Sequence, residues 1–277
     1  MAATIRNLFA SLMLVQAVVF PLRSQEIIYG SNNGKYVEVS GRDVYYEEYG
    51  EGEPILMLHG GPGSIANFSK VIPELSKNYR VIAMDTPGQG RSERARDLSF
   101  QLLAENASAF IDKMAIIKCY VVGWSDGACT GLLLAANRPD VISKVFVSGA
   151  FSNIDGFTEE SKAFWSTITP ETVEKSLGGW HLEYQRLYPE IDWKTLIQDL
   201  RNMVNNKIYI TEEKLKSISS KVLLAYGDND VFTLEHIVYL HKTIRDTELM
   251  ILPGTSHSTF EEQPEMMSLA IKGFFKK

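Results

Sequence analysis

Along most of the chain, short uninterrupted apolar runs alternate with longer stretches whose apolar positions recur with a helical period. Runs without a polar interruption are typical of strands that are covered on both faces of a sheet. Four such runs precede residue 150, at 54–60, 80–85, 119–124 and 143–149. The stretches between them, 65–78, 99–115 and 126–137, have the spacing or composition of helices. This alternation predicts parallel βαβ units.

Residues 35–50 have a different pattern. The segments KYVEVSG and RDVYYEEYG alternate apolar and polar positions, and a glycine separates them. A period of two residues is typical of a strand with one covered face, so we expect a β-hairpin before the first parallel strand.

The alternation of strand and helix stops over residues 151–216. This stretch has no convincing strand pattern, several helical segments and three of the four tryptophans of the chain. The strand and helix patterns resume at 221–230 and continue to a final amphipathic helix from about residue 260. We therefore expect an α/β core formed by residues 25–150 and 217–277, with 151–216 inserted as a helical lid that has an apolar underside.

The N-terminal residues 1–24 do not fit the core pattern. A single arginine precedes Leu8–Phe20, a run of 13 mostly apolar residues that ends at Pro21. A membrane span needs about 20 such residues, whereas a signal peptide has a shorter apolar region. We predict a signal peptide that is cleaved after Ser24, an exported (periplasmic or secreted) mature protein and no stable membrane span. A buried helix or an N-terminal anchor is the alternative.

Composition and charge indicate which kinds of molecule the protein is expected to bind. The 277 residues have an ordinary globular composition and a net charge of −6, with both signs interleaved along the chain. Because no basic stripe is present, we do not expect a nucleic-acid partner. The two cysteines, Cys119 and Cys129, have neither metal-ligand spacing nor a disulfide pattern. We expect a small-molecule substrate and no metal site.

The segment GWSDG, residues 123–127, joins the third apolar run to a predicted helix. It matches the G-x-S-x-G nucleophile elbow, in which a serine lies on a strained turn and glycines two residues away on each side prevent collisions. We therefore predict Ser125 as a nucleophile. The alternative is that Ser125 only caps the helix.

A serine nucleophile needs a base, and the base needs a carboxylate to orient it. His257 follows the last predicted strand, and GDND (227–230) follows the strand before it. We predict His257 as the base and Asp230 as the carboxylate, with Asp228 as the alternative and Asp155 a more distant one. The order Ser, Asp, His, each residue after a strand, is typical of α/β-hydrolases.

The backbone of two residues can provide an oxyanion hole. Gly61, in the HGGPGS segment after a buried strand, can bring its N–H close to a substrate oxygen, and Asp126 begins the helix after the nucleophile. We predict these two donors, with Gly60 as an alternative to Gly61. Trp124 is predicted to line an acyl pocket, with core packing as the alternative. The Asp126 carboxylate is a candidate partner for a substrate ammonium.

A dinucleotide-binding protein is a rival interpretation. Residues 61–66 satisfy G-x-G-x-x-A after a strand, and Asp85 ends the next strand. However, His59 interrupts the junction of strand and glycines, and this interpretation leaves Ser125 and His257 without a role.

The motifs HGGPG, DTPGQGRS, GWSDG and GDND, with the late His257, resemble those of the α/β-hydrolase superfamily from about residue 35 to the C-terminus. The resemblance implies an eight-stranded, mostly parallel sheet with a helical cap after strand six, and no metal or organic cofactor. GWSDGA is similar to the biphenyl-hydrolase-like and C–C hydrolase branch, and HGGPG to proline iminopeptidases. The aspartate nucleophile of epoxide hydrolases and haloalkane dehalogenases does not fit Asp126, because Trp124 and Ala128 take the places of the two glycines.

The residues and the resemblance together predict a serine hydrolase of a small ester or related acyl compound that forms an acyl-enzyme intermediate. The alternatives are a C–C bond hydrolase, a proline-iminopeptidase-like aminopeptidase and a non-catalytic ligand-binding protein. The triad alone does not separate the hydrolase classes, because the lid sets the substrate.

Overall fold

A computed structural model describes residues 26–29, 34–176, 179–205 and 209–276. The predicted signal peptide, residues 1–24, lies outside the described residues. Among the residues that are described, no helix has the length and apolar character required to span a membrane.

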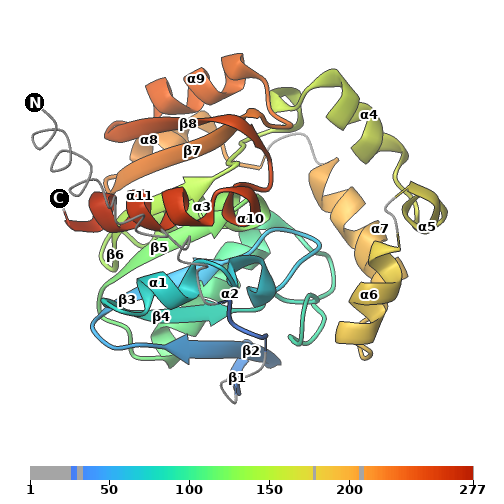
Figure 1. Cartoon of the computed structure of the whole chain (residues 1–277), viewed down its shortest axis with the longest axis horizontal. Coiled ribbons are helices and arrows are strands. Elements are labelled where there is room, and N and C mark those ends of the chain that lie inside the picture. The colour runs from blue at the N-terminus through green and yellow to red at the C-terminus, as the bar shows by residue number, and fades with distance from the viewer. Residues whose placement is uncertain (1–25, 30–33, 177–178, 206–208, 277) are drawn as a thin grey trace, which may run out of the picture.

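One eight-stranded sheet crosses the molecule in the order β1-β2-β4-β3-β5-β6-β7-β8 (Figure 1). The β1 and β2 strands form the predicted hairpin, and β2 also pairs antiparallel with β4. All other pairs are parallel, which confirms the predicted fold class. The strands are β1 (Lys35–Val39), β2 (Arg42–Tyr49), β3 (Glu53–Leu58), β4 (Tyr79–Met84), β5 (Cys119–Trp124), β6 (Ile142–Ser148), β7 (Lys221–Asn229) and β8 (Thr247–Ser256).

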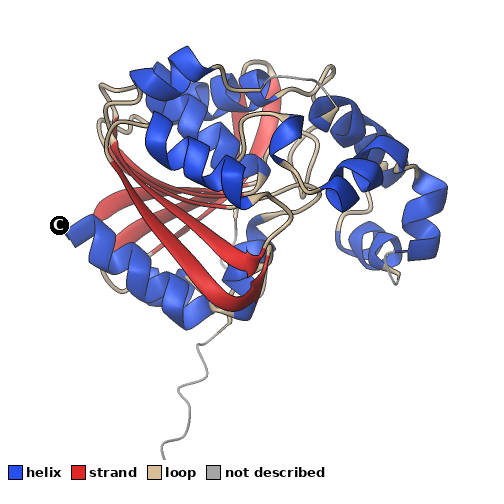
Figure 2. Cartoon of the chain, turned by 90° about the horizontal axis from the view of Figure 1, so that it is seen from above, coloured by secondary structure: helices blue, strands red, loops and turns tan. Residues whose placement is uncertain are grey.

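Helices cover both faces of the sheet, which Figure 2 shows nearly edge-on. One face is covered by α2 (Phe100–Lys113), α3 (Asp126–Asn137), α8 (Glu212–Ser217) and α9 (Leu234–Thr243). The opposite face is covered by α1 (Ile72–Leu75), α10 (Thr259–Glu262) and α11 (Pro264–Lys276), with the 3-10 helix η1 (Ile65–Phe68) beside them.

The central strands are uninterrupted apolar runs because both of their faces are buried. In β3, Leu56 and Leu58 belong to the hydrophobic cluster under α2 and α3, whereas Ile55 and Met57 belong to the cluster under α11. Successive side chains of a strand point to opposite faces, so each face needs its own apolar set.

The helical insertion lies between β6 and β7, as the predicted cap after strand six requires. The short η2 (Ile154–Gly156) leads into α4 (Glu159–Thr167), α5 (Pro170–Ser176), α6 (Trp180–Leu187) and α7 (Trp193–Val204), which contact one another at one end of the sheet (Figures 1 and 2). The α8 helix, which we had expected in the lid, packs on α3 and α9 instead. We therefore limit the lid to α4–α7.

The lid has the expected apolar underside. Along α7 the buried side chains are Trp193, Leu196, Ile197, Leu200, Met203 and Val204. Their spacing places them on one face of the helix. Leu200 on this face lies against the loop that follows β3.

Candidate active site

Ser125 lies between the end of β5 and the first residue of α3. Its backbone has φ 54° and ψ −118°, a region that a residue with a side chain rarely adopts. The Ser125 side chain makes no capping hydrogen bond to α3, so the alternative of a simple helix cap is not what the structure shows. The backbone N–H of Ser125 instead donates to the Ser148 carbonyl oxygen at 2.9 Å, which ties the turn to β6.

The two glycines of the elbow are required by close backbone contacts. A Cβ atom on Gly127 would collide with the carbonyl of Leu58 on β3, and one on Gly123 would collide with the backbone of Gly127. These contacts let α3 begin directly beside β3 and β5. The steric reason predicted for the glycines is therefore seen in the packing.

The structure brings Ser125, His257 and Asp230 together. The His257 Nε2 atom lies 2.9 Å from the Ser125 Oγ, and its Nδ1 atom lies 2.8 Å from the Asp230 Oδ1. Each of the three residues directly follows a strand, β5, β7 or β8, whose carboxyl ends meet at one edge of the sheet. The side chain of Asp230 is only 1% exposed and that of His257 is 22% exposed, so the pair is shielded but the imidazole is accessible.

The geometry distinguishes between the candidate carboxylates. Asp228 Oδ1 accepts hydrogen bonds from the Thr255 N–H at 3.1 Å and from the Asn229 side chain at 2.9 Å. Asp155 is exposed and does not contact His257. Asp230 is the carboxylate that meets the imidazole.

Two residues that the sequence analysis did not assign hold the imidazole in place. Gly149, directly after β6, has φ +65°, and a Cβ atom there would lie 2.5 Å from Cε1 of His257. The ring of Phe232 meets the His257 ring edge-on, with a centroid distance of 5.5 Å. In the sequence, the glycine at the end of the fourth apolar run was the signal for this packing.

Trp124 holds the loop of His257. Its indole N–H donates to the His257 carbonyl oxygen at 2.9 Å, and the two rings lie 5.5 Å apart. Trp124 is not among the residues that line the cavity at Ser125. The geometry thus favours the packing alternative over the predicted acyl-pocket role.

The predicted oxyanion donors lie beside the nucleophile. Asp126 is the first residue of α3, where backbone N–H groups have no partner within the helix. Gly61 borders the same cavity as Ser125 and lies against the Asp126 carboxyl, whereas Gly60 is absent from the cavity lining and packs on the Ser125 Cβ. This arrangement favours Gly61 over Gly60.

Asp126, which borders the cavity, also has a buried carboxyl group beside Gly61. The residue is 4% exposed, and its Oδ2 atom makes no hydrogen bond to any described residue. Burial raises the pKa of Asp126 to about 7, although the nearby His257 lowers it. A carboxyl in such a place changes its charge near neutral pH.

The cavity at Ser125 has a volume of about 550 Å³. Aromatic side chains form much of its wall, namely Phe151, Phe157, Phe164, Trp165 and Phe232. The charged side chains of its described lining are all acidic: Asp126, Glu160 and Asp230. A larger cavity of about 860 Å³ lies between residues 87–98 and the α6–α7 turn, but it includes no residue of the triad. Ser125, Asp230 and His257 therefore all border the smaller cavity.

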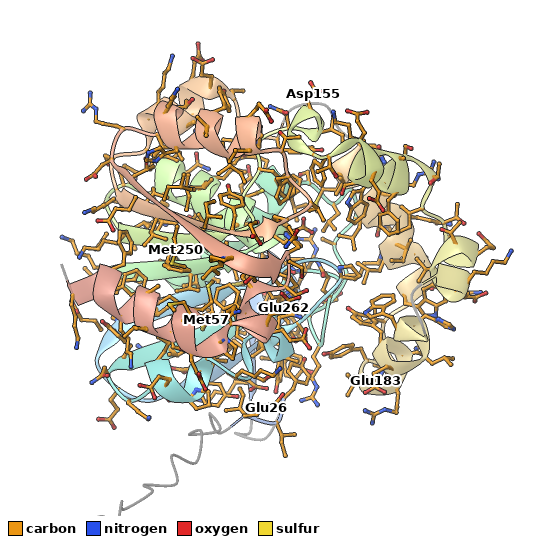
Figure 3. The ribbon with its side chains drawn as sticks, turned by 45° about the horizontal axis from the view of Figure 1, so that its top comes forward. Glu26, Met57, Asp155, Glu183, Met250 and Glu262 are labelled. Atoms are coloured by element: carbon orange, nitrogen blue, oxygen red, sulfur yellow. The ribbon has the colours of Figure 1, made fainter. Side chains whose placement is uncertain are left out.

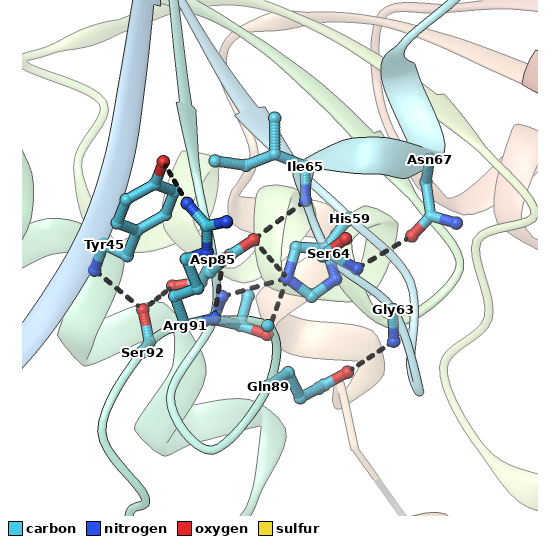
Figure 4. A network of polar contacts seen from close by, with 12 residues as sticks. Tyr45, His59, Gly63, Ser64, Ile65, Asn67, Asp85, Gln89, Arg91 and Ser92 are labelled. Carbon is cyan, nitrogen blue, oxygen red and sulfur yellow. Dashed lines mark hydrogen bonds and ion pairs between the residues drawn. The ribbon is translucent and has the colours of Figure 1, made fainter. Parts of the chain in front are cut away.

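The glycine-rich loop after β3 is not built for a dinucleotide. Only the four-residue η1 follows it, and the Asp85 carboxylate already accepts the N–H groups of Ile65 and Arg91, each at 2.8 Å (Figure 4). His59 accepts the Thr86 N–H on Nε2 at 3.0 Å, and burial lowers its pKa to about 4. Asp85 is thus occupied within the protein, and His59 is a neutral structural residue.

The arrangement permits nucleophilic catalysis. A neutral imidazole at 2.9 Å can take the hydroxyl proton of Ser125 as the oxygen attacks an electrophile, and Asp230 fixes the orientation of the ring.

Replacing Gly149 by alanine should displace His257 and slow the reaction of Ser125 with a fluorophosphonate by about 100-fold, because small misplacements of a catalytic group are costly. Gly254→Ala is the matched control, since Gly254 also has φ +65° but a Cβ there meets nothing within 4 Å. Both variants place an alanine at the same positive φ, so equal labelling rates in the two would show that Gly149 does not determine the position of His257.

Comparisons with known proteins find similarity to hydrolases. The family model for the alpha/beta hydrolase fold matches residues 53–175. The serine hydrolase BPHL of Homo sapiens is 27% identical, and the match covers 80% of this chain and 79% of that protein. The 2-hydroxy-6-oxo-6-phenylhexa-2,4-dienoate hydrolase of Comamonas testosteroni is also 27% identical, with coverage of 87% and 96%.

Solved structures share the fold. The crystal structure of a meta-cleavage product hydrolase (CumD) superposes with a TM-score of 0.72 at 23% identity, over 88% of this chain and 98% of that one. The sheet order, the helical insertion after β6 and the named relatives lead to one conclusion. The chain has the α/β-hydrolase fold, is similar over most of its length to named hydrolases, and is a hydrolase.

Proposed function

We propose that the chain hydrolyses small carboxylic esters or related acyl compounds through an acyl-enzyme intermediate on Ser125. The observation that carries this proposal is the chain of contacts from the Ser125 Oγ through His257 to Asp230, at the wall of a cavity rich in aromatic side chains. A protein without catalytic activity would have no need for an accessible serine in strained backbone geometry next to an imidazole whose carboxylate partner is buried.

Acylation follows from the positions of these groups. The Ser125 Oγ attacks the carbonyl carbon while His257 Nε2 takes the hydroxyl proton, and the Asp230 carboxylate stabilises the imidazolium. The N–H groups of Gly61 and Asp126 hold the negative oxygen of the tetrahedral intermediate. The intermediate collapses, the C–O bond to the alcohol breaks, and the alcohol leaves with the proton from His257.

Deacylation repeats these steps with water. His257 takes a proton from water as the water oxygen attacks the acyl carbon of Ser125. The second tetrahedral intermediate collapses to the carboxylic acid, and His257 returns the proton to the Ser125 oxygen. The lid helices α4 and α7, which contribute to the cavity wall, shape the acyl pocket.

The cavity lining suits an acyl group that carries an ammonium. Asp126 provides an unpaired carboxyl oxygen beside Gly61, and Glu160 lies at the wall on α4. No arginine or lysine belongs to the described part of the lining. An aromatic wall can also stabilise a cation. We therefore propose aminoacyl esters as the preferred class of substrate.

Cleavage of a C–C bond is a weaker candidate. The substrate named for the Comamonas testosteroni relative is a dienoate, which carries a carboxylate. An acidic lining without a described cation disfavours an anionic substrate by like-charge repulsion. Amide cleavage by the same triad remains an activity to compare, with aminoacyl nitroanilides beside aminoacyl nitrophenyl esters.

Ser125→Ala should lower kcat for p-nitrophenyl esters by at least about 10⁴-fold, because the nucleophile is lost while the oxyanion donors stay. Steady-state kinetics measure the loss, and circular dichroism checks the fold. Ser166→Ala, the same change on the exposed side of α4, is the control and should act like the wild type. Near wild-type turnover by Ser125→Ala would disprove the role of this serine.

Asp126→Asn keeps the backbone N–H but removes the charge. It should lower kcat/KM for a valine ester about tenfold or more, relative to the 3-methylbutanoate ester, which lacks the ammonium. Equal losses for both esters would show that Asp126 does not select for an amino group.

The pKa of Asp126 gives a pH dependence with a defined sign. Because burial raises this pKa to about 7, the carboxyl is largely neutral below that pH and charged above it. Competitive inhibition by 2-methylpropylamine, which stays protonated, should therefore strengthen about tenfold from about pH 6 to about pH 8. The Asp126→Asn variant should lose this dependence, and its persistence would assign the titration to another group.

A further inference from the structure

The short segment Glu26–Tyr29 lies beside the loop that carries Gly61. The N–H of Ile27 donates to the Ser69 carbonyl oxygen at 3.0 Å, and the Ser69 hydroxyl donates to Glu26 at 3.0 Å. Glu26 and Glu183 of the lid helix α6, both labelled in Figure 3, border one cavity. The segment thus reaches both the core and the lid.

Tyr29 and the oxyanion loop, which we define as residues 59–65, meet at one buried carboxylate. The Tyr29 hydroxyl donates to Oδ2 of Asp85, a residue that is fully buried. The N–H of Ile65 donates to Oδ1 of Asp85, and the N–H of Arg91 donates to Oδ2 (Figure 4). Asp85 therefore links the segment Glu26–Tyr29, the oxyanion loop and the loop after β4.

The ring of Tyr29 also supports the lid. It meets the ring of Tyr188, the residue after α6, edge-on at a centroid distance of 5.5 Å. The Tyr188 hydroxyl lies 2.5 Å from the Ser64 Oγ, which belongs to the oxyanion loop. The guanidinium of Arg91 lies over the Tyr29 ring, 4.5 Å from its centroid.

We propose that Tyr29 is a positioning residue for the oxyanion site: its hydroxyl fixes the oxyanion loop through Asp85, and its ring holds α6 on the same loop through Tyr188. This inference rests on the proposed function, since it assigns Gly61 to the oxyanion. Tyr29 does not line the cavity at Ser125, so it acts through Asp85 and not on the substrate.

The physical reason is the geometry of oxyanion stabilisation. A backbone N–H lowers the barrier only if it points to the place where the negative charge develops. Ile65 follows Gly61 by four residues, and its N–H bond to Asp85 limits the movement of the loop between them. Loss of the Tyr29 hydroxyl removes one donor to Oδ2 of Asp85 and leaves the Arg91 N–H as its partner there, so the carboxylate is held less firmly and its bond to Ile65 loosens.

Tyr29→Phe tests the inference, because it removes the hydroxyl and keeps the ring. We expect kcat for p-nitrophenyl esters to fall about tenfold while KM changes less than about twofold. Inhibition by a trifluoromethyl ketone, which forms an oxyanion on the nucleophile, should weaken by the same factor as kcat/KM. Tyr36→Phe is the matched control, since Tyr36 is 56% exposed on β1 and should act like the wild type.

A second variant tests the contact between Tyr188 and Ser64. Tyr188→Phe removes the hydroxyl that meets Ser64, and it should also lower kcat and ketone affinity in parallel. The double variant should lose less than the product of the two single losses, because both act on one loop.

The possible failures are distinguishable. A Tyr29→Phe variant with wild-type kcat and ketone affinity would overturn the inference and leave the proposed function intact. A lower melting temperature with unchanged kcat and ketone affinity would likewise overturn it, since the role would be structural only. A wild-type protein that neither turns over esters nor binds the ketone would overturn the proposed function itself, and the inference with it.

Discussion

The backbone turn at Ser125 is the constraint on which the rest of the site depends. For a residue with a side chain, the conformation at φ 54° and ψ −118° costs on the order of 1–3 kcal/mol. The surrounding structure therefore has to hold Ser125 in this conformation. Here β5 is paired on both sides, and α3 is buried continuously from Asp126 to Ala135. Neither element can shift to relax the turn, and the hydroxyl stays directed to His257.

Much of the fold and the three central residues of the site could be predicted because their signals are local. Apolar runs that need two buried faces, and helical spacing between them, identify a parallel sheet. The elbow glycines mark the close contacts of Gly123 and Gly127. Strand ends on one edge of a sheet then bring Ser125, Asp230 and His257 together from distant positions in the chain.

The remaining features depend on contacts that no local pattern encodes. Asp228 lies at the end of β7 and Asp230 directly follows it, but Asp228 accepts the Thr255 N–H whereas Asp230 meets His257. Trp124 does not line the cavity at Ser125, and its indole N–H instead donates to the carbonyl oxygen of His257, 133 residues later in the chain. The Tyr29–Asp85 hydrogen bond joins residues that are 56 positions apart in the chain. The α8 helix packs on α3 and α9 of the core, although its helical pattern continues that of the lid helices.

The central claim is that Ser125 carries the acyl group during turnover. It is tested most directly by mixing the protein with p-nitrophenyl dimethylcarbamate, whose carbamoyl-enzyme hydrolyses slowly, and digesting the product for mass spectrometry. We expect one p-nitrophenol to be released rapidly per chain and a dimethylcarbamoyl group to be found on Ser125. Ester hydrolysis by a protein that acquires no such group, or that carries it on another residue, would contradict the account.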